Sequence, residues 1–232
     1  MRIWDINPGY LNRHSLLGEH RELHGISSII LNNKKGYSQH PETIRWVGYG
    51  WALEMRHKQL ACEMALREFT DRSPINMRSN KGVWPSQYID EPSRQYQLLK
   101  EKYKDKEKGR IPLPLNPQQI WSQHKYSVLA RDQSLYRGIG RDVAHGKCGF
   151  SELASLLTEI LRIPPNEGGI RNALQHMWGY VSHNKYQKQT DLNNWSLKEL
   201  LTETQKRAKK QNEQYLMAST ALSDLMVWLL NA

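Results

Sequence analysis

The sequence predicts an all-α protein made of two helical domains. Apolar residues recur at spacings of three and four along most of the chain, which is typical of helices that bury one face. No segment shows the alternation of apolar and polar residues that indicates a β-strand. A charged, proline-containing segment divides the 232 residues near their middle. A chain of this length can bury a sizeable core without disulfides or metal ions.

The first half contains three predicted helices. Leu16, Leu23, Ile26 and Ile30 form one apolar stripe and predict a helix over residues 15–32. A similar stripe predicts a second helix over 51–69. A third helix is expected over 93–106. Prolines in the intervening segment favour a loop between the last two helices.

The segment that follows is the predicted domain boundary. Residues 100–110 read KEKYKDKEKGR, and three prolines between residues 111 and 117 favour an extended backbone path. We therefore expect an N-terminal domain at 1–98, a linker at 99–117 and a second domain at 118–232. A strap packed between the two domains is the alternative interpretation of the linker.

The second half is also predicted to be helical. Ser196 and Glu199 have the spacing of a capping box, which starts the last helix. That helix is expected to break within its polar stretch at 203–214. The predicted helices span residues 118–131, 134–144, 151–161, 171–184 and 196–230.

The composition favours a polyanionic partner. Lys and Arg total 33 against 23 Asp and Glu, so the formal net charge is +10, which suits nucleic acid. The 8 Trp and 11 Tyr, against 2 Phe, supply rings that can also stack on unpaired bases. No apolar run has the length of a membrane span, and the N-terminus lacks a signal-peptide core. We therefore expect a cytoplasmic protein, associated with the nucleoid, that has no membrane partner.

Metal and cysteine chemistry are weaker interpretations of the sequence. His20 and His24 lie four residues apart on a predicted helix, a spacing that can chelate zinc. Glu22 lies about 200° around that helix from His20, away from the chelating face. The chain has no Cys-x-x-Cys, and the two cysteines, Cys62 and Cys148, form no disulfide framework. We predict no metal and no cofactor.

The most distinctive segment is HSLLGEHRELH at residues 14–24. Glu19 and Glu22 lie one helical turn apart, close to Arg21 and His14. A carboxylate among cationic groups, next to a nucleic acid backbone, can serve as a general acid or base. A solvated helix face with mixed charges is the alternative.

Four motifs within residues 1–75 carry a family resemblance. They read MRIWDINPGYLNRHSLLGEHRELHGI, NKKGYSQHPETIRW, ALEMRHKQLACEM and RSPI. Together they resemble the pyrimidine dimer DNA glycosylase/endonuclease V family. The next segment, WPSQYIDEPSRQYQLLKEKYKDKEKGRIPLPL, resembles longer bacterial members of that family. The C-terminal stretches IWSQHKYSVLARDQSLYRGIGRDVA and RNALQHMWGYVS are similar to a helical family of unknown function.

The resemblance implies an enzyme that excises pyrimidine dimers from UV-damaged double-stranded DNA. By the family's pattern, the α-amine of Met1 is the nucleophile, Glu22 is the acid/base group, and Arg2 and Arg21 position the substrate. An α-amine has a pKa of about 7.7–8.0, against about 10.4 for lysine, so far more of it is neutral at physiological pH. A Schiff base and β-elimination follow, and this chemistry requires no metal or redox cofactor.

The remaining expectations concern the partners. Tyr37, Trp46 and Trp51 are expected in the core more than against bases. The predicted DNA contacts are Arg2, His14, His20, Arg21, His24, Lys34, Lys35, Arg45, Arg56 and His57. The second domain is expected to extend DNA binding or to dock a protein partner. Its basic surface would comprise His124, Lys125, Tyr126, Arg131, Arg137, Arg141 and Arg171 if they share a face. The alternatives are the same scaffold acting on another damaged or modified base, and a non-catalytic nucleic-acid-binding module.

Overall fold

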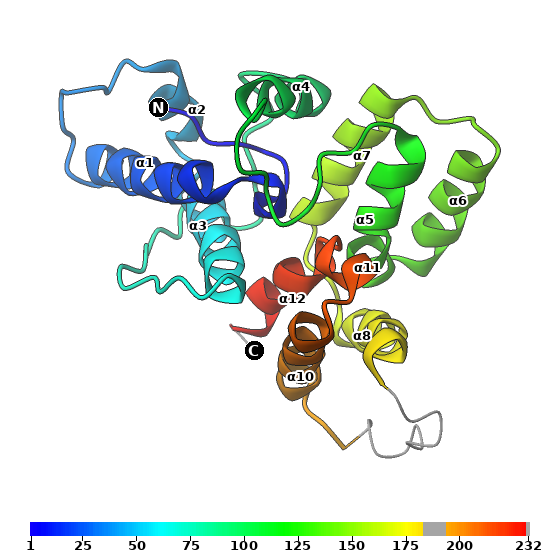
Figure 1. Cartoon of the computed structure of the whole chain (residues 1–232). Coiled ribbons are helices and arrows are strands. Elements are labelled where there is room, and N and C mark those ends of the chain that lie inside the picture. The colour runs from blue at the N-terminus through cyan, green and yellow to red at the C-terminus, as the bar shows by residue number, and fades with distance from the viewer. Residues whose placement is uncertain (183–193, 231–232) are drawn as a thin grey trace. The chain divides into compact units, whose positions relative to one another are not determined.

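The computed structural model describes residues 1–182 and 194–230, and these residues form helices and loops without a β-strand. The all-α prediction is therefore confirmed. The chain divides into two compact units, Met1–Gly109 and Arg110–Ala232 (Figure 1). This division falls inside the segment 99–117. Among the described residues, no helix combines the length and the apolar character needed to cross a lipid bilayer.

Unit 1 consists of a short 3-10 helix and α-helices joined by long loops. Its two long helices, α1 and α3, pack against each other, and Leu16, Leu23 and Leu60 are fully buried. The short helix α2 has too few residues to show a periodic pattern, and it was not predicted. The elements are η1 (Pro8–Tyr10), α1 (Arg13–Leu31), α2 (Pro41–Trp46), α3 (Gly50–Leu66) and α4 (Pro92–Lys102).

Two helices of unit 1 end before their predicted positions, and loop residues explain one of these ends. Helix α3 ends at Leu66 rather than 69, because Glu68 adopts a positive φ of 67°, which a continuing α-helix does not allow. Helix α4 ends at Lys102 rather than 106, and Asp105 beyond it also has a positive φ of 58°.

Unit 2 is a bundle in which α5 contacts α6, α7, α8 and α12. The capping box of Ser196 and Glu199 is present at the start of α10. The last predicted helix is broken at Asn212, which adopts a left-handed conformation within the predicted 203–214 stretch. The predicted end of the 171–184 helix lies outside the described residues. The helices are α5 (Pro117–Leu129), α6 (Gln133–Ala144), α7 (Phe150–Arg162), α8 (Glu167–Val181), α10 (Leu197–Gln211), α11 (Gln214–Met217) and α12 (Ala221–Leu229).

Candidate active site

The N-terminal segment, residues 1–7, is held by side chains of α1. The segment has no regular secondary structure, so its backbone groups need partners from elsewhere in the fold. The N–H of Arg2 donates to Oε2 of Glu22 at 2.5 Å. The N–H of Trp4 donates to Oε1 of Glu19 at 3.2 Å. Two carboxylates one turn apart on α1 thus fix the start of the chain.

Side chains of α3 and α4 hold the same segment further along. The N–H of Asp5 donates to Oε1 of Gln95 at 2.8 Å, and Nε2 of Gln95 donates to the Asp5 carboxylate at 2.9 Å. Nη1 of Arg56 donates to the carbonyl oxygen of Ile6 at 2.9 Å. The segment therefore has a defined path, because three helices supply its hydrogen bonds.

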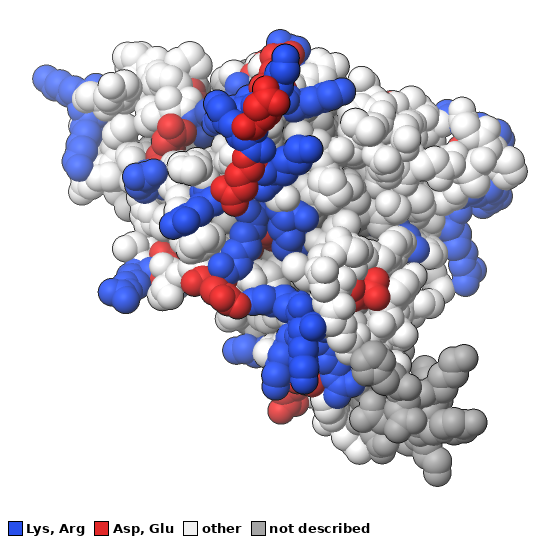
Figure 2. Space-filling view, in the orientation of Figure 1, with Lys and Arg blue, Asp and Glu red and all other residues white. Residues whose placement is uncertain are grey.

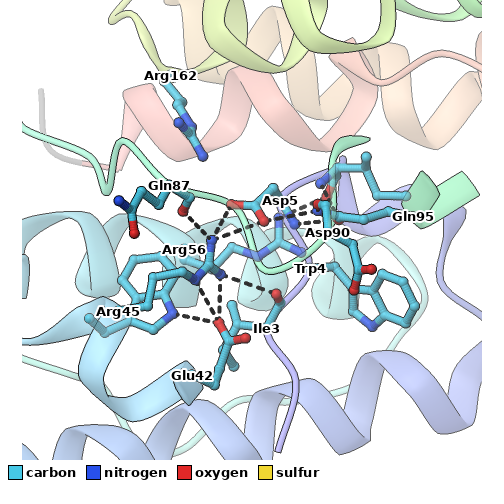
Figure 3. Close-up of polar contacts among 12 residues, drawn as sticks. Ile3, Trp4, Asp5, Glu42, Arg45, Arg56, Gln87, Asp90, Gln95 and Arg162 are labelled. Carbon is cyan, nitrogen blue, oxygen red and sulfur yellow. Dashed lines mark hydrogen bonds and ion pairs between the residues drawn. The ribbon is translucent and has the colours of Figure 1, made fainter. Parts of the chain in front are cut away.

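Arg45 of α2 completes this arrangement. Nη1 donates to both carboxylate oxygens of Asp5, at 2.9 and 3.0 Å, and Nη2 donates to Glu42 at 2.6 Å (Figure 3). Nη2 also donates to the carbonyl oxygen of Ile3 at 3.3 Å. Burial disfavours the charge on Arg45, but Asp5 and Glu42 raise its pKa above the ordinary value.

The two carboxylates of α1 differ in their surroundings. Glu19 is 1% exposed and accepts from Nε and Nη2 of Arg56 at 2.7 and 3.1 Å. Burial raises the pKa of Glu19 to about 7, although Arg56 acts to lower it. Glu22 is only partly buried. Glu22 is thus the carboxylate that a ligand can reach, whereas Glu19 positions the backbone.

Glu22 contacts the backbone N–H of Arg2, and both Met1 and Arg2 are partly buried. The Arg2 guanidinium pairs with Asp90 at 2.7 Å and lies over the Trp4 ring, 4.1 Å from its centroid. This arrangement places an accessible carboxylate one peptide group from the α-amine of Met1. An amine and a carboxylate placed this close along the chain could act as a nucleophile and a general acid/base.

The predicted DNA contacts divide into exposed and buried residues. His14, Arg21, Lys34 and Lys35 are exposed, and Arg2 is partly exposed. The prediction is corrected for Arg45, Arg56 and His57, whose side chains are 5%, 2% and 4% exposed. Buried carboxylates pair with both arginines: Glu42 lies one turn from Arg45 on α2, whereas Asp5 and Glu19 come from distant segments that only folding brings close.

The aromatic residues also depart in part from expectation. Trp46 is buried as predicted, and its Nε1 donates to Glu42 at 3.0 Å. Trp51 is partly buried and meets Trp84 edge to face. Tyr37, expected in the core, is 71% exposed in the loop between α1 and α2. That loop also carries Lys34 and Lys35, so it presents two cations and a ring to solvent.

Three of the predicted DNA contacts converge on one another instead. His20 and His24 of α1 and His57 of α3 point their Nε2 atoms together, with Asp71 beside them. These four ligand atoms lie within 4.8 Å of one another and could hold a metal ion. Burial lowers the pKa of His57 to about 4, although Asp71 acts to raise it. Asp71 was not singled out from the sequence, because no local pattern marks it.

Unit 2 has a smaller basic surface than predicted. His124 is 3% exposed, and Arg131 is buried in an ion pair with Asp224 at 2.8 Å. Arg137 and Arg141 are exposed on α6, whereas Lys125 and Arg171 are partly buried. Figure 2 shows one face of the protein, on which Lys and Arg side chains are widely spread and Asp and Glu are fewer.

Two segments of the chain match different protein-family models. Residues 1–77 match the family described as "Pyrimidine dimer DNA glycosylase". Residues 125–224 match the family described as "Protein of unknown function (DUF1722)". No curated protein and no solved structure matches the chain. The N-terminal match supports a DNA-repair glycosylase role and DNA binding, and it includes Glu22 and the histidine cluster.

Proposed function

We propose that unit 1 is a DNA glycosylase with AP-lyase activity that excises pyrimidine dimers from UV-damaged double-stranded DNA. Met1 supplies the nucleophilic α-amine, and Glu22 is the acid/base group. The observation that carries this proposal is the 2.5 Å hydrogen bond from the N–H of Arg2 to Glu22, which fixes the carboxylate beside the first residue. The family match over residues 1–77 supports the glycosylase role.

The reaction begins when the neutral α-amine attacks C1′ of the damaged nucleotide. Glu22 has first taken the proton that the Met1 ammonium gives up, which leaves the amine neutral. The N–C1′ bond forms, the glycosidic bond breaks, and the departing base takes a proton from the newly bonded nitrogen. Glu22 then returns its proton to the sugar ring oxygen, which opens the ring and leaves a protonated Schiff base between Met1 and C1′. The Glu22 carboxylate next takes a proton from C2′, the 3′ phosphate leaves, and water releases the amine. This β-elimination cuts the strand on the 3′ side.

The anchoring of residues 1–7 supports this role for the amine. An unanchored chain terminus would sample many positions, and fixing a nucleophile in a reactive geometry lowers the barrier substantially. Here Glu19, Gln95 and Arg56 hold the backbone at Trp4, Asp5 and Ile6. Glu22 therefore accepts a hydrogen bond only from the first peptide N–H of this segment and remains able to act on the substrate.

The exposed cations of unit 1 are our proposed DNA contacts. Arg21, Lys34 and Lys35 are exposed, and His14 lies exposed in the first turn of α1. Contacts of this kind to phosphates supply affinity without reading the base sequence. Specificity for the lesion would then depend on how easily the damaged bases leave the stack.

The decisive experiment is borohydride trapping with untagged protein. Three duplexes are compared, which carry a thymine dimer, an abasic site or neither. We expect a covalent adduct on the dimer duplex that maps to Met1. Glu22→Gln should slow product formation by about 10²–10⁴-fold. Glu101→Gln, which alters an exposed carboxylate on α4, is the matched control and should leave the rate unchanged.

The other outcomes separate the alternatives. An adduct on the abasic duplex alone would retain the lyase and favour another damaged or modified base as the substrate. No adduct on any duplex would reject the mechanism and favour a non-catalytic binding module. Full activity of a protein extended by residues before Met1 would reject the α-amine as the nucleophile.

Unit 2 is proposed to extend the DNA contact or to dock a protein partner. Arg137 and Arg141 are exposed one turn apart on α6 and offer a test. If unit 2 binds DNA, replacing both with alanine should weaken the salt dependence of affinity. An unchanged salt dependence would favour the protein partner.

A further inference from the structure

The histidine cluster has the spacing of a tetrahedral metal site. Nε2 of His57 lies 3.2 Å from Nε2 of His20 and 3.2 Å from Nε2 of His24. Asp71 places one carboxylate oxygen 3.2 Å from Nε2 of His20 and the other 3.5 Å from Nε2 of His57. Ligands about 2.0–2.1 Å from a tetrahedral zinc ion lie about 3.3–3.4 Å apart. These four separations lie close to that value, and the ligand atoms, one from each residue, all lie within 4.8 Å of one another.

Hydrogen bonds among the histidines account for these contacts less well than a metal ion at the centre of the cluster does. A neutral imidazole has one N–H, and Nε2 of His57 faces two other ring nitrogens and a carboxylate oxygen. A single proton on Nε2 of His57 cannot form hydrogen bonds to all three of these atoms at once. A cation at the common centre would satisfy the three nitrogens and the carboxylate together.

We propose that His20, His24, His57 and Asp71 form a structural Zn²⁺ site. Imidazole nitrogens with one carboxylate oxygen are a ligand set that zinc accepts readily. Four protein ligands would close the coordination shell, which is typical of structural sites, whereas catalytic zinc keeps a position open. The site would therefore not activate water.

The site would join three parts of unit 1. Its ligands come from α1, from α3 and from the loop after α3. Between α3 and Asp71 lies Arg67, which donates to the carbonyl oxygens of Leu11 at 2.7 Å and Gly9 at 3.1 Å. Glu22 lies about 200° around α1 from His20, on a different face of that helix. Zinc would thus brace the scaffold of the proposed active site without contacting the substrate.

The test is a Zn²⁺ titration of the full chain, purified without a polyhistidine tag and stripped with EDTA. We expect one Zn²⁺ per chain, a higher Tm with Zn²⁺ than with EDTA, and the intense visible absorption of tetrahedral Co²⁺ after substitution. Loss of one ligand should weaken Zn²⁺ binding at least about 10–100-fold, since loss of an outer-shell partner alone has that effect.

The variants are His24→Ala and Asp71→Asn, and both side chains are only partly buried. His14→Ala is the matched control, because it removes an exposed histidine from the same helix and should leave Zn²⁺ affinity unchanged. Circular dichroism confirms that each variant is folded before titration. Absence of stoichiometric Zn²⁺ binding by the wild type would overturn the proposal. Unchanged Zn²⁺ affinity in a protein that combines His24→Ala with Asp71→Asn would also overturn it. Borohydride trapping is a separate readout, so the two proposals can fail independently.

Discussion

Replacing Arg45 with methionine should lower the free energy of unfolding by about 3–5 kcal/mol. The side chains of Arg45, Asp5 and Glu42 are 5%, 4% and 2% exposed. An exposed ion pair contributes about 0–1 kcal/mol, but breaking a buried one costs about 3–5 kcal/mol, because a charge stays buried without its partner. Whole domains are stable by only about 5–15 kcal/mol, so this loss is large.

Two further variants test the physical reason. Arg45→Lys keeps the charge but lacks the planar fork that reaches Asp5 and Glu42 together, so it should be intermediate in stability. Glu42→Gln combined with Arg45→Met should be more stable than Arg45→Met alone, because it removes one stranded charge. The glutamine also retains an acceptor for Nε1 of Trp46, which now donates to Glu42 at 3.0 Å.

The assay is urea unfolding at pH 7, followed by circular dichroism and tryptophan fluorescence, with DNA affinity measured in parallel at fixed salt. We expect Arg45→Met to lower the free energy of unfolding. We do not expect it to remove a direct contact with DNA. If Arg45→Met lost less than about 1 kcal/mol, the value for exposed pairs, and weakened DNA binding, the residue would be an exposed DNA contact and the reasoning would be refuted.

Two other predictions concern charge. Replacing Lys34 and Lys35 with alanine should reduce the slope of log affinity against log salt by about 2, because each exposed lysine is expected to contact one phosphate. Filter-binding or fluorescence titrations measure this slope, and an unchanged slope would contradict the prediction. Stability should also fall as the pH drops from about 6.5 to about 4. Burial lowers the pKa of His124 to about 4. Between about pH 6.5 and 4, this histidine therefore binds a proton in the unfolded chain but not in the folded protein. The loss is at most about 3 kcal/mol, and His124→Gln should flatten the pH profile of urea unfolding over this range; an equally steep profile would assign the acid lability to other groups.

The long helices could be predicted from the sequence because each buries one face. The stripe of Leu16, Leu23 and Ile26 follows the helical period, and all three residues are fully buried on α1. Helix α2 has only six residues, so it offers no period to detect. Its signals are local, namely Pro41 in the first turn and the side chain of His40, which accepts from the N–H of Glu42.

The candidate site could be predicted only where its residues lie within a motif. Glu22 was singled out on that ground, whereas Gln95 and Arg45 contact Asp5 from 90 and 40 residues away. Residue type alone does not distinguish a buried arginine from an exposed one, which is why Arg45 was expected at the surface. The pair His20 and His24 was visible as a helical spacing, but His57 joins it only through the packing of α1 on α3.

The anchoring of the N-terminal segment sets a minimum length for an independently folding fragment. The family match ends at residue 77, but the partners of the chain's first residues extend well beyond it. Gln95 binds the backbone of Asp5, and the hydroxyl of Tyr103 accepts from the N–H of Asn12 at 3.0 Å. A fragment cut at residue 77 would retain Glu22 but lose both of these partners. During synthesis, Asp5 and Asn12 likewise gain these two partners only after residues 95 and 103 have been made.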